Sequence, residues 1–242
     1  MINMTGWMST FYNHLERFLG DSSCSKCIVL FDIDGTLLDT RHLICNVLHQ
    51  YDKAFNTSLF SHLDVRHVTC HESNIAPLLT QLNVHKKQHK QILDWFEQKC
   101  WEEKTIRNHH QPYPRVFHHI KQLRDLNVDV ILVTGRPESY RHPTLESINY
   151  FASQEGIVFA QEELNMNPRT WSDGPPSSKR NTAQRYIREG FTILAVFDNE
   201  PDSIQMYSEL IDDSQTLLMH ADTIYKSSRF LLPKSTVSGF GY

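Results

Sequence analysis

The stretch "FDIDGTLLDT" at residues 31–40 places two carboxylates two positions apart, directly after the apolar run "CIVL". A carboxylate at the end of a buried strand can act as a nucleophile that forms an acyl-phosphate. A second carboxylate nearby can protonate the leaving group and then activate water. We therefore interpret Asp32 as the candidate nucleophile and Asp34 as the candidate acid/base. Gly35, which permits a sharp turn and a close approach to phosphate, and Thr36 are candidate substrate-binding residues.

Later segments contain the donors and cations that this chemistry needs around a transferring phosphate. Thr134 ends "VILVT" and carries a hydroxyl that can donate to a phosphate oxygen, and Gly135 has an unobstructed backbone amide. Arg136 is a further candidate for binding the substrate. Lys179, in "PPSSKR", lies at an expected helix start, from which it can neutralise both phosphate and the Asp32 carboxylate.

The same chemistry needs a divalent cation, because phosphate and carboxylates repel each other. Mg²⁺ prefers a few oxygen ligands together with substrate phosphate, and it stabilises in-line displacement. Asp198 follows the apolar run "ILAVF" and is the candidate metal ligand beside Asp32.

Four short apolar runs predict the strands that position these residues. They cover residues 27–31, 128–133, 193–197 and 216–219. Each run is continuous, which is typical of strands buried on both faces of a parallel sheet. Helical patterns at 143–151 and 179–188 lie between the later runs, and 167–178 reads as a loop. The alternation predicts a doubly wound, Rossmann-like α/β fold. Ligands of such sheets bind beyond the carboxyl ends of the strands, where these runs end in polar residues.

Residues 41–113 interrupt this alternation with far more chain than a crossover helix requires. They show helical patterns at 41–56, 74–82 and 86–103 and no convincing strand, so we predict an inserted α-helical module. The α/β core is then formed by residues 1–40 and 114–242. A further helical stripe at residues 4–19 is expected to dock on that core.

Composition narrows the class of protein. The 242-residue chain is 40% apolar and 21% charged, which is ordinary for a soluble globular domain. Its net charge of −4 gives no basic footprint for nucleic acid. Five scattered cysteines indicate a reducing compartment rather than a disulfide framework, and the single Cys24–Cys27 pair lacks the second pair of a zinc site. With no membrane-spanning apolar stretch and no signal peptide, we expect a cytoplasmic protein.

The motifs, taken in order, resemble those of the haloacid dehalogenase superfamily. "FDIDGTLLDT" is similar to the first motif of the family, "ILVTGRP" to the second, Lys179 to the third and "VFDNEPD" to the fourth. The fourth departs from a common pattern, because Asn199 stands where many members have a second aspartate. The resemblance implies Asp202, four positions beyond Asp198, as a second candidate metal ligand, and Glu200 is the alternative to it. The usual activity of the family is Mg²⁺-dependent hydrolysis of phosphate esters.

The resemblance implies a metal site and a cap. The backbone carbonyl of Asp34, rather than its side chain, would bind Mg²⁺ beside the carboxylates of Asp32 and Asp198. A helical cap would follow the first motif, where residues 41–113 lie. The predicted function is thus that of a phosphatase that acts on a small phosphorylated metabolite, with no membrane partner.

Three other functions stay open at this point. The first is a phosphatase that acts on nucleotide or nucleic-acid end phosphates, against which the acidic balance of the chain argues. The second is a phosphomutase, in which the same acid/base residue would serve. The third is a non-catalytic regulatory protein on the same fold, since a fold alone never proves activity. The presence of every catalytic residue type favours an enzyme.

Overall fold

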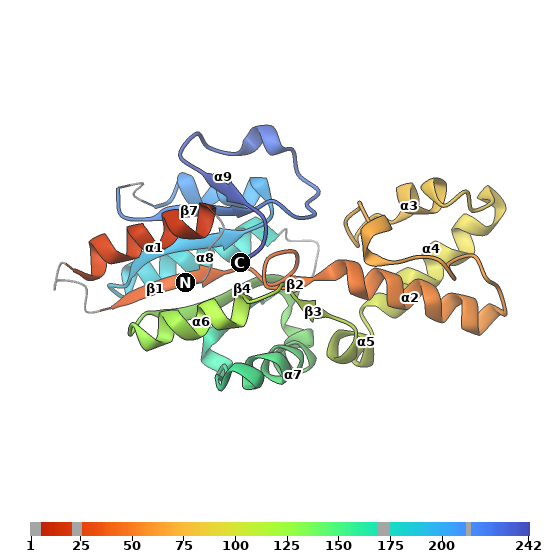
Figure 1. The fold of residues 1–242 in the computed structure, drawn as a ribbon, viewed down its shortest axis with the longest axis horizontal. Coiled ribbons are helices and arrows are strands. Elements are labelled where there is room, and N and C mark those ends of the chain that lie inside the picture. The colour runs from red at the N-terminus through yellow and green to blue at the C-terminus, as the bar shows by residue number, and fades with distance from the viewer. Residues whose placement is uncertain (1–5, 21–25, 169–174, 212–213) are drawn as a thin grey trace. The chain divides into compact units, whose positions relative to one another are not determined.

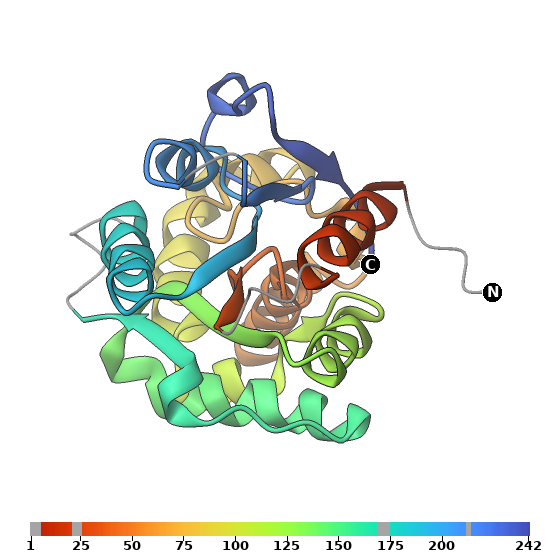
Figure 2. The ribbon, with the colours of Figure 1, turned by 90° about the vertical axis from the view of Figure 1, so that its left-hand side faces the viewer.

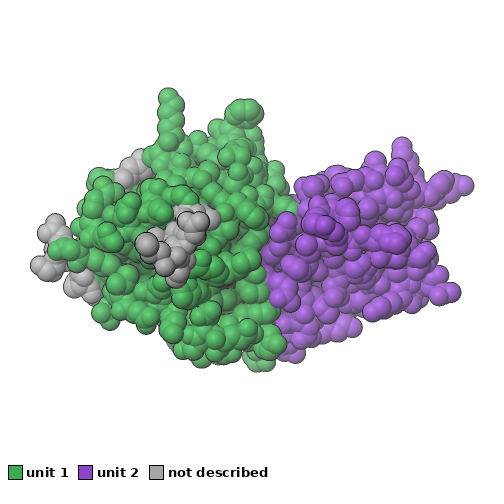
Figure 3. All heavy atoms as spheres, viewed as in Figure 1, with its two compact units in different colours: residues 1–37, 112–242 green, residues 38–111 purple. Residues whose placement is uncertain are grey.

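The computed structural model describes residues 6–20, 26–168, 175–211 and 214–242. The chain divides into two compact units, which Figure 3 distinguishes by colour. Unit 1 consists of residues 1–37 and 112–242, and unit 2 of residues 38–111. The predicted insertion, 41–113, has neighbouring bounds, and its role as a cap stays a prediction.

Unit 1 is built on a six-stranded parallel sheet with the strand order β5-β4-β1-β6-β7-β8. The strands are β1 (Cys27–Phe31), β4 (Asp129–Pro137), β5 (Leu164–Asn167), β6 (Thr192–Asp198), β7 (Leu217–Ala221) and β8 (Val237–Gly239). The four apolar runs correspond to β1, β4, β6 and β7. The two edge strands, β5 and β8, were not anticipated, because both are short and β5 alternates its apolar residues with asparagine.

Helices cover both faces of this sheet, as Figure 2 shows. They are α1 (Gly6–Leu19), α6 (Val116–Asp125), α7 (Arg141–Ala152), α8 (Pro175–Arg188) and α9 (Pro201–Ser208), with short 3-10 turns at Glu138–Tyr140, Ser153–Glu155, Gln161–Glu163 and Arg229–Leu231. Helices α8 and α9 pack on one face, against β4 to β7, and α1 and α6 on the other. The predicted doubly wound α/β class is confirmed. None of the helices described is long and apolar enough to cross a membrane.

The central strand β1 contributes to two separate cores. Ile28 and Leu30 lie in an apolar cluster together with Tyr207 of α9. On the opposite face, Phe31 stacks on Phe197 of β6 with ring centroids 4.3 Å apart. All five residues of β1 are buried, as expected for the centre of a doubly covered sheet. The loop that begins at Asp32 therefore starts from a rigidly packed strand.

Unit 2 is mainly helical. Its elements are α2 (Thr40–Phe55), α3 (Ala76–Gln81), α4 (Lys86–Cys100), α5 (Glu103–Asn108) and the 3-10 turn Val65–His67 (Figure 1). The helix predicted at 86–103 corresponds to α4, which ends three residues earlier, at Cys100. Two short strands, β2 (Leu38–Asp39) and β3 (Gln111–Pro112), pair with each other. The expectation that residues 41–113 contain no strand is therefore wrong, because β3 lies within them. Asp39 caps α2 by accepting a bond from the Arg41 amide at 3.1 Å.

The cysteines differ in one respect from the sequence-based expectation. Cys27, at the start of β1, is disulfide-bonded, although the scattered cysteines predicted no disulfides. Cys45, Cys70 and Cys100 are free thiols. Cys24 lies outside the described residues.

A buried histidine in α6 makes the stability of the protein sensitive to acid. The ring of His119 is almost inaccessible, and its Nδ1 lies 2.7 Å from the Tyr12 hydroxyl. Burial, followed by the nearby Arg115 charge, lowers the pKa of His119 to about 4. In the unfolded chain, His119 therefore binds a proton below a pH of about 6.5. In the folded chain, it does so only below a pH of about 4. His119 contributes stability that is fully present above this window and is lost as the pH falls through it.

We expect a His119→Gln variant to lose less stability on acidification than the wild type. The difference should amount to at most about 1.4 kcal/mol per pH unit within the window. Urea unfolding at several pH values between 7 and 4 measures it. His142→Gln serves as the control, because the His142 side chain is 73% exposed. Equal acid sensitivity in the wild type and the His119 variant would show that this histidine does not control the effect.

Candidate active site

The two central parallel strands place Asp32 and Asp198 at the same edge of the sheet. Phe31 and Phe197 are register partners, and each is followed directly by one of the two aspartates. The Asp32 amide donates to the Phe197 carbonyl at 2.9 Å, which continues the ladder by one more bond. Both carboxylates are buried, with residue exposures of 6% and 1%.

Lys179 joins these two carboxylates. Its Nζ lies 2.7 Å from Asp32 Oδ1 and 2.6 Å from Asp198 Oδ2. The lysine lies inside α8, because this helix begins at Pro175 rather than at Lys179. The predicted loop at 167–178 is therefore wrong at both ends, since Asn167 belongs to β5 and residues 175–178 are helical. Residues 169–174 lie outside the described residues.

Burial controls the electrostatics of this cluster. Burial raises the pKa of Asp32 well above its ordinary value, against the opposing effect of the Lys179 ammonium. Burial also raises the pKa of Asp198. For Lys179, burial acts to lower the pKa, but the carboxylates of Asp198 and Asp32 outweigh it and raise the pKa well above the ordinary value. One ammonium between two buried carboxylates leaves a site that favours a further cation.

The turn after Asp32 is tightly packed on the loop that follows β6. Gly35 has a φ of 81°, the left-handed region that glycine adopts without strain. The Thr36 hydroxyl donates to Asn199 Oδ1 at 3.5 Å, and the Thr36 carbonyl accepts from the Tyr242 hydroxyl at 3.0 Å. Thr36 was predicted to bind substrate, yet its hydroxyl is directed at Asn199. Asn199 is thus a packing partner of the motif rather than an evident replacement for an acidic ligand.

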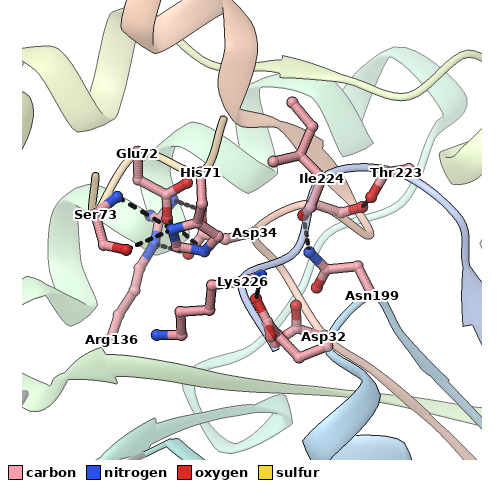
Figure 4. Close-up of polar contacts among 12 residues, drawn as sticks. Asp32, Asp34, His71, Glu72, Ser73, Arg136, Asn199, Thr223, Ile224 and Lys226 are labelled. Carbon is pink, nitrogen blue, oxygen red and sulfur yellow. Dashed lines mark hydrogen bonds and ion pairs between the residues drawn. The ribbon is translucent and has the colours of Figure 1, made fainter. Parts of the chain in front are cut away.

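Arg136 holds the carboxylate of Asp34. Its Nε donates to Asp34 Oδ2 at 2.7 Å and one terminal nitrogen donates to Oδ1 at 2.6 Å (Figure 4). The other terminal nitrogen donates to the Thr144 hydroxyl at 3.0 Å. The guanidinium is fully buried, and its bidentate geometry fixes the orientation of the Asp34 carboxyl group. Arg136 was predicted to bind substrate, whereas the structure directs its side chain at the candidate acid/base.

Thr134 and Gly135 lie near the carboxyl end of β4, the neighbour of β1. The Thr134 hydroxyl oxygen accepts from the Arg136 amide at 3.1 Å, which leaves its own proton for another acceptor. Thr134 is buried and Gly135 is half-buried. The two residues thus lie at the end of the sheet that also carries Asp32 and Asp198, and their role as donors to a substrate stays a prediction.

The acidic residues after Asp198 take different roles. Both oxygens of Glu200 accept bonds from residues 226 and 227, at 3.0 to 3.2 Å, so Glu200 anchors a loop instead of standing ready as a metal ligand. Asp202 Oδ1 is buried and has no hydrogen-bond partner among the residues that the structure describes. Within the same residues, no three His, Cys, Asp or Glu side chains are grouped for a metal ion. The two carboxylates that share a contact with Lys179 are those of Asp32 and Asp198.

Sequence reasoning missed the loop at residues 222–228, which follows β7. The Thr223 hydroxyl donates to the Gly35 carbonyl at 2.6 Å, and the Asn199 amide group donates to the Ile224 carbonyl at 2.6 Å (Figure 4). This loop therefore contacts both the first and the fourth motif. The sequence "DTIYKSS" carries no motif that predicts these contacts.

The sequence matches the family described as haloacid dehalogenase-like hydrolase over residues 29–172, which is more than half of the chain. Among curated proteins none matches the sequence. The match begins in β1 and so includes the pair Asp32 and Asp34.

Solved structures share the fold. A haloacid dehalogenase family hydrolase from Deinococcus radiodurans, determined with bound phosphate and sodium, is 14% identical with a TM-score of 0.54, over 91% of this chain and 93% of the other. A predicted phosphoglycolate phosphatase from Haemophilus somnus is also 14% identical, with a TM-score of 0.50 over 84% of this chain and 88% of the other. At this level of identity the two structures support the fold.

Proposed function

The chain belongs to the haloacid dehalogenase-like hydrolase family, and from this premise we propose that it hydrolyses small-molecule phosphomonoesters through a phosphorylated Asp32. The contact of Lys179 with both Asp32 and Asp198, at 2.7 and 2.6 Å, carries the proposal. This ammonium lies beside the nucleophile, where it can stabilise negative charge on a transferring phosphoryl group.

The proposed reaction has two steps. In the first, an oxygen of Asp32 attacks phosphorus, the bond from phosphorus to the ester oxygen breaks, and Asp34 gives that oxygen a proton. In the second, Asp34 takes a proton from a water molecule, which attacks phosphorus and releases inorganic phosphate and the Asp32 carboxylate. Thr134 and Gly135 would donate hydrogen bonds to the phosphoryl oxygens during both steps.

Arg136 acts in this scheme as a positioning residue for Asp34. Each Asp34 oxygen accepts one bond from the guanidinium, which fixes the plane of the carboxylate. A carboxylate oxygen has two acceptor positions, so a bond from the guanidinium does not by itself prevent proton transfer. Once Asp34 has given up its proton in the first step, it is a carboxylate, the form that serves as the base in the second step.

The residues at the site fit a magnesium ion. The carboxylates of Asp32 and Asp198 and the backbone carbonyl of Asp34 are hard oxygen donors, and Mg²⁺ is commonly held by one or two carboxylates plus substrate phosphate. The buried, unpartnered Oδ1 of Asp202 is a further oxygen, in the first turn of α9 and four positions after Asp198. When bound, Mg²⁺ would neutralise charge on the phosphate and stabilise in-line displacement.

We expect chelation to remove at least about 99% of the activity toward p-nitrophenyl phosphate, because without a divalent cation the carboxylates repel the phosphate. Adding Mg²⁺ should restore the activity. Ca²⁺ is the matched control, since it prefers more ligands at longer distances and should restore much less. Full turnover by a protein shown by elemental analysis to be metal-free would contradict the proposed site.

Unit 2 and the charge of the chain bear on the substrate. We propose that unit 2 serves as the cap of the enzyme, and that its residues select a small phosphorylated metabolite. The net charge of −4 argues against nucleic acid as the substrate, because binding to nucleic acid rests on neutralising many phosphates.

A further inference from the structure

The loop at residues 222–228 is fastened to the candidate active site at several points. Thr223 bonds to the Gly35 carbonyl of the first motif, and Ile224 accepts a bond from Asn199, next to Asp198. Both distances are 2.6 Å. This part of the loop is thus held to the two motifs that carry the candidate nucleophile and the candidate metal ligand.

Glu200 fixes the backbone at the middle of the same loop. Its Oε1 accepts from the Lys226 amide at 3.0 Å, and its Oε2 accepts from the Ser227 amide and hydroxyl at 3.2 and 3.0 Å. Glu200 is only 8% exposed. A buried carboxylate that accepts three bonds from two consecutive residues defines where the Lys226 side chain leaves the backbone.

Lys226 directs its side chain into the site. In the view of Figure 4, the side chain extends into the space between Asp32 and Arg136. Lys226 is exposed, and its ammonium forms no ion pair with any residue of the described chain. The two other cations of the site are already engaged, Lys179 with Asp32 and Asp198, and Arg136 with Asp34. Lys226 therefore supplies a positive charge that the catalytic groups do not neutralise.

We propose that Lys226 binds a second anionic group carried by the leaving group of the substrate. The inference rests on the proposed hydrolysis and narrows its substrate class to phosphomonoesters whose alcohol also bears a carboxylate or another anion. An ammonium facing an anion forms a charge-assisted hydrogen bond. A substrate that lacks the anion cannot form this bond. Lys226 would therefore raise kcat/KM for substrates with the anion relative to substrates without it.

The proposal can be tested with two substrates of nearly equal size, phosphoglycolate and ethyl phosphate. Both are phosphate esters of a two-carbon alcohol, and only phosphoglycolate carries a carboxylate. The wild type should prefer phosphoglycolate. Lys226→Ala should lower the ratio of the two kcat/KM values by about tenfold or more, chiefly through the KM for phosphoglycolate. Lys226→Arg should retain most of the preference. Lys234→Ala, which removes an exposed lysine further along the chain, is the control for net charge.

Several outcomes would overturn the proposal. A wild type without preference, or an unchanged ratio in Lys226→Ala, would leave Lys226 as a solvated surface residue. An equal loss for both substrates would place Lys226 on the transferring phosphate instead.

A binding experiment separates failure of this inference from failure of the proposed hydrolysis. Calorimetric titration of the Asp32→Asn protein with the same two compounds requires no turnover. Selective binding of phosphoglycolate that disappears in the Asp32→Asn/Lys226→Ala protein supports the role of Lys226, even if the wild type were to hydrolyse neither compound. Unselective binding that Lys226→Ala leaves unaltered overturns the role, even if hydrolysis is confirmed.

Discussion

Replacing Asp32 with asparagine is expected to lower kcat for p-nitrophenyl phosphate by roughly 10⁴-fold or more, because the amide cannot form the acyl-phosphate. The variant should nevertheless fold. Asparagine is close to the same size, and Lys179 keeps its 2.6 Å contact with Asp198. Since burial already disfavours the Asp32 charge, we expect the thermal midpoint of the variant to equal or exceed that of the wild type.

The matched control is Asp129→Asn. Asp129 is exposed at the start of β4, the end of the strand opposite to Thr134. The control makes the same chemical change and should keep the activity of the wild type. Robust turnover by a folded Asp32→Asn protein would sink the proposed nucleophile, whereas an unfolded variant would be recognised by its thermal midpoint.

Gly35→Ala is expected to be the most damaging change in the loop after the nucleophile. A Cβ on Gly35 would lie 2.1 Å from Asn199 Nδ2 and 2.7 Å from Asn199 Cγ, and the residue would keep a φ of +81° that disfavours alanine. The loop must therefore shift. We expect a loss of about 1–3 kcal/mol in the free energy of unfolding and a fall in kcat of about 10²-fold, as a small misplacement of reacting groups produces.

A second glycine with a similar φ makes it possible to separate the backbone strain of an alanine from its steric collision with Asn199. Gly190 has a φ of +80°, and a Cβ there would meet nothing within 4 Å, so Gly190→Ala measures the backbone strain alone. The collision with Asn199 is isolated by a double-mutant cycle of Gly35→Ala and Asn199→Ala, in which the double variant should be less destabilised than the sum of the single variants. Additive effects, together with equal losses at Gly35 and Gly190, would contradict the close packing described here.

A helix or strand can be predicted from the sequence only when its own residues carry a pattern typical of that element. The strand at residues 27–31 is predictable because five consecutive apolar residues mark a strand buried on both faces. The edge strand Leu164–Asn167 has no such signal, since its sequence "LNMN" becomes a strand by pairing with β4. Pro175 and Pro176 suggest a loop, yet proline is tolerated in the first turn of a helix, and α8 starts there.

The candidate site divides in the same way. The order of the motifs and the parallel strands suffice to bring Asp32, Lys179 and Asp198 to one edge, because adjacent parallel strands end together. The partners of side chains are not encoded locally. Arg136 lies 102 positions from Asp34, and nothing in either sequence neighbourhood identifies the pair. Nor does "VFDNEPD" indicate that Glu200 would bind the loop at 226–227, more than twenty positions away.

Phosphorylation of Asp32 can be detected with the Asp34→Asn variant. Nitrophenolate leaves without needing a proton, so p-nitrophenyl phosphate should still phosphorylate Asp32 in this variant. The second step lacks its base and should become slow. We expect a burst of one nitrophenolate per enzyme molecule, followed by slow turnover.

Acid quenching at the end of the burst, followed by mass spectrometry of the peptide that contains residues 31–40, locates the phosphoryl group. We expect one phosphoryl group, on Asp32. A phosphoryl group on another residue, or sustained turnover with no burst and no phosphorylated Asp32, would contradict it.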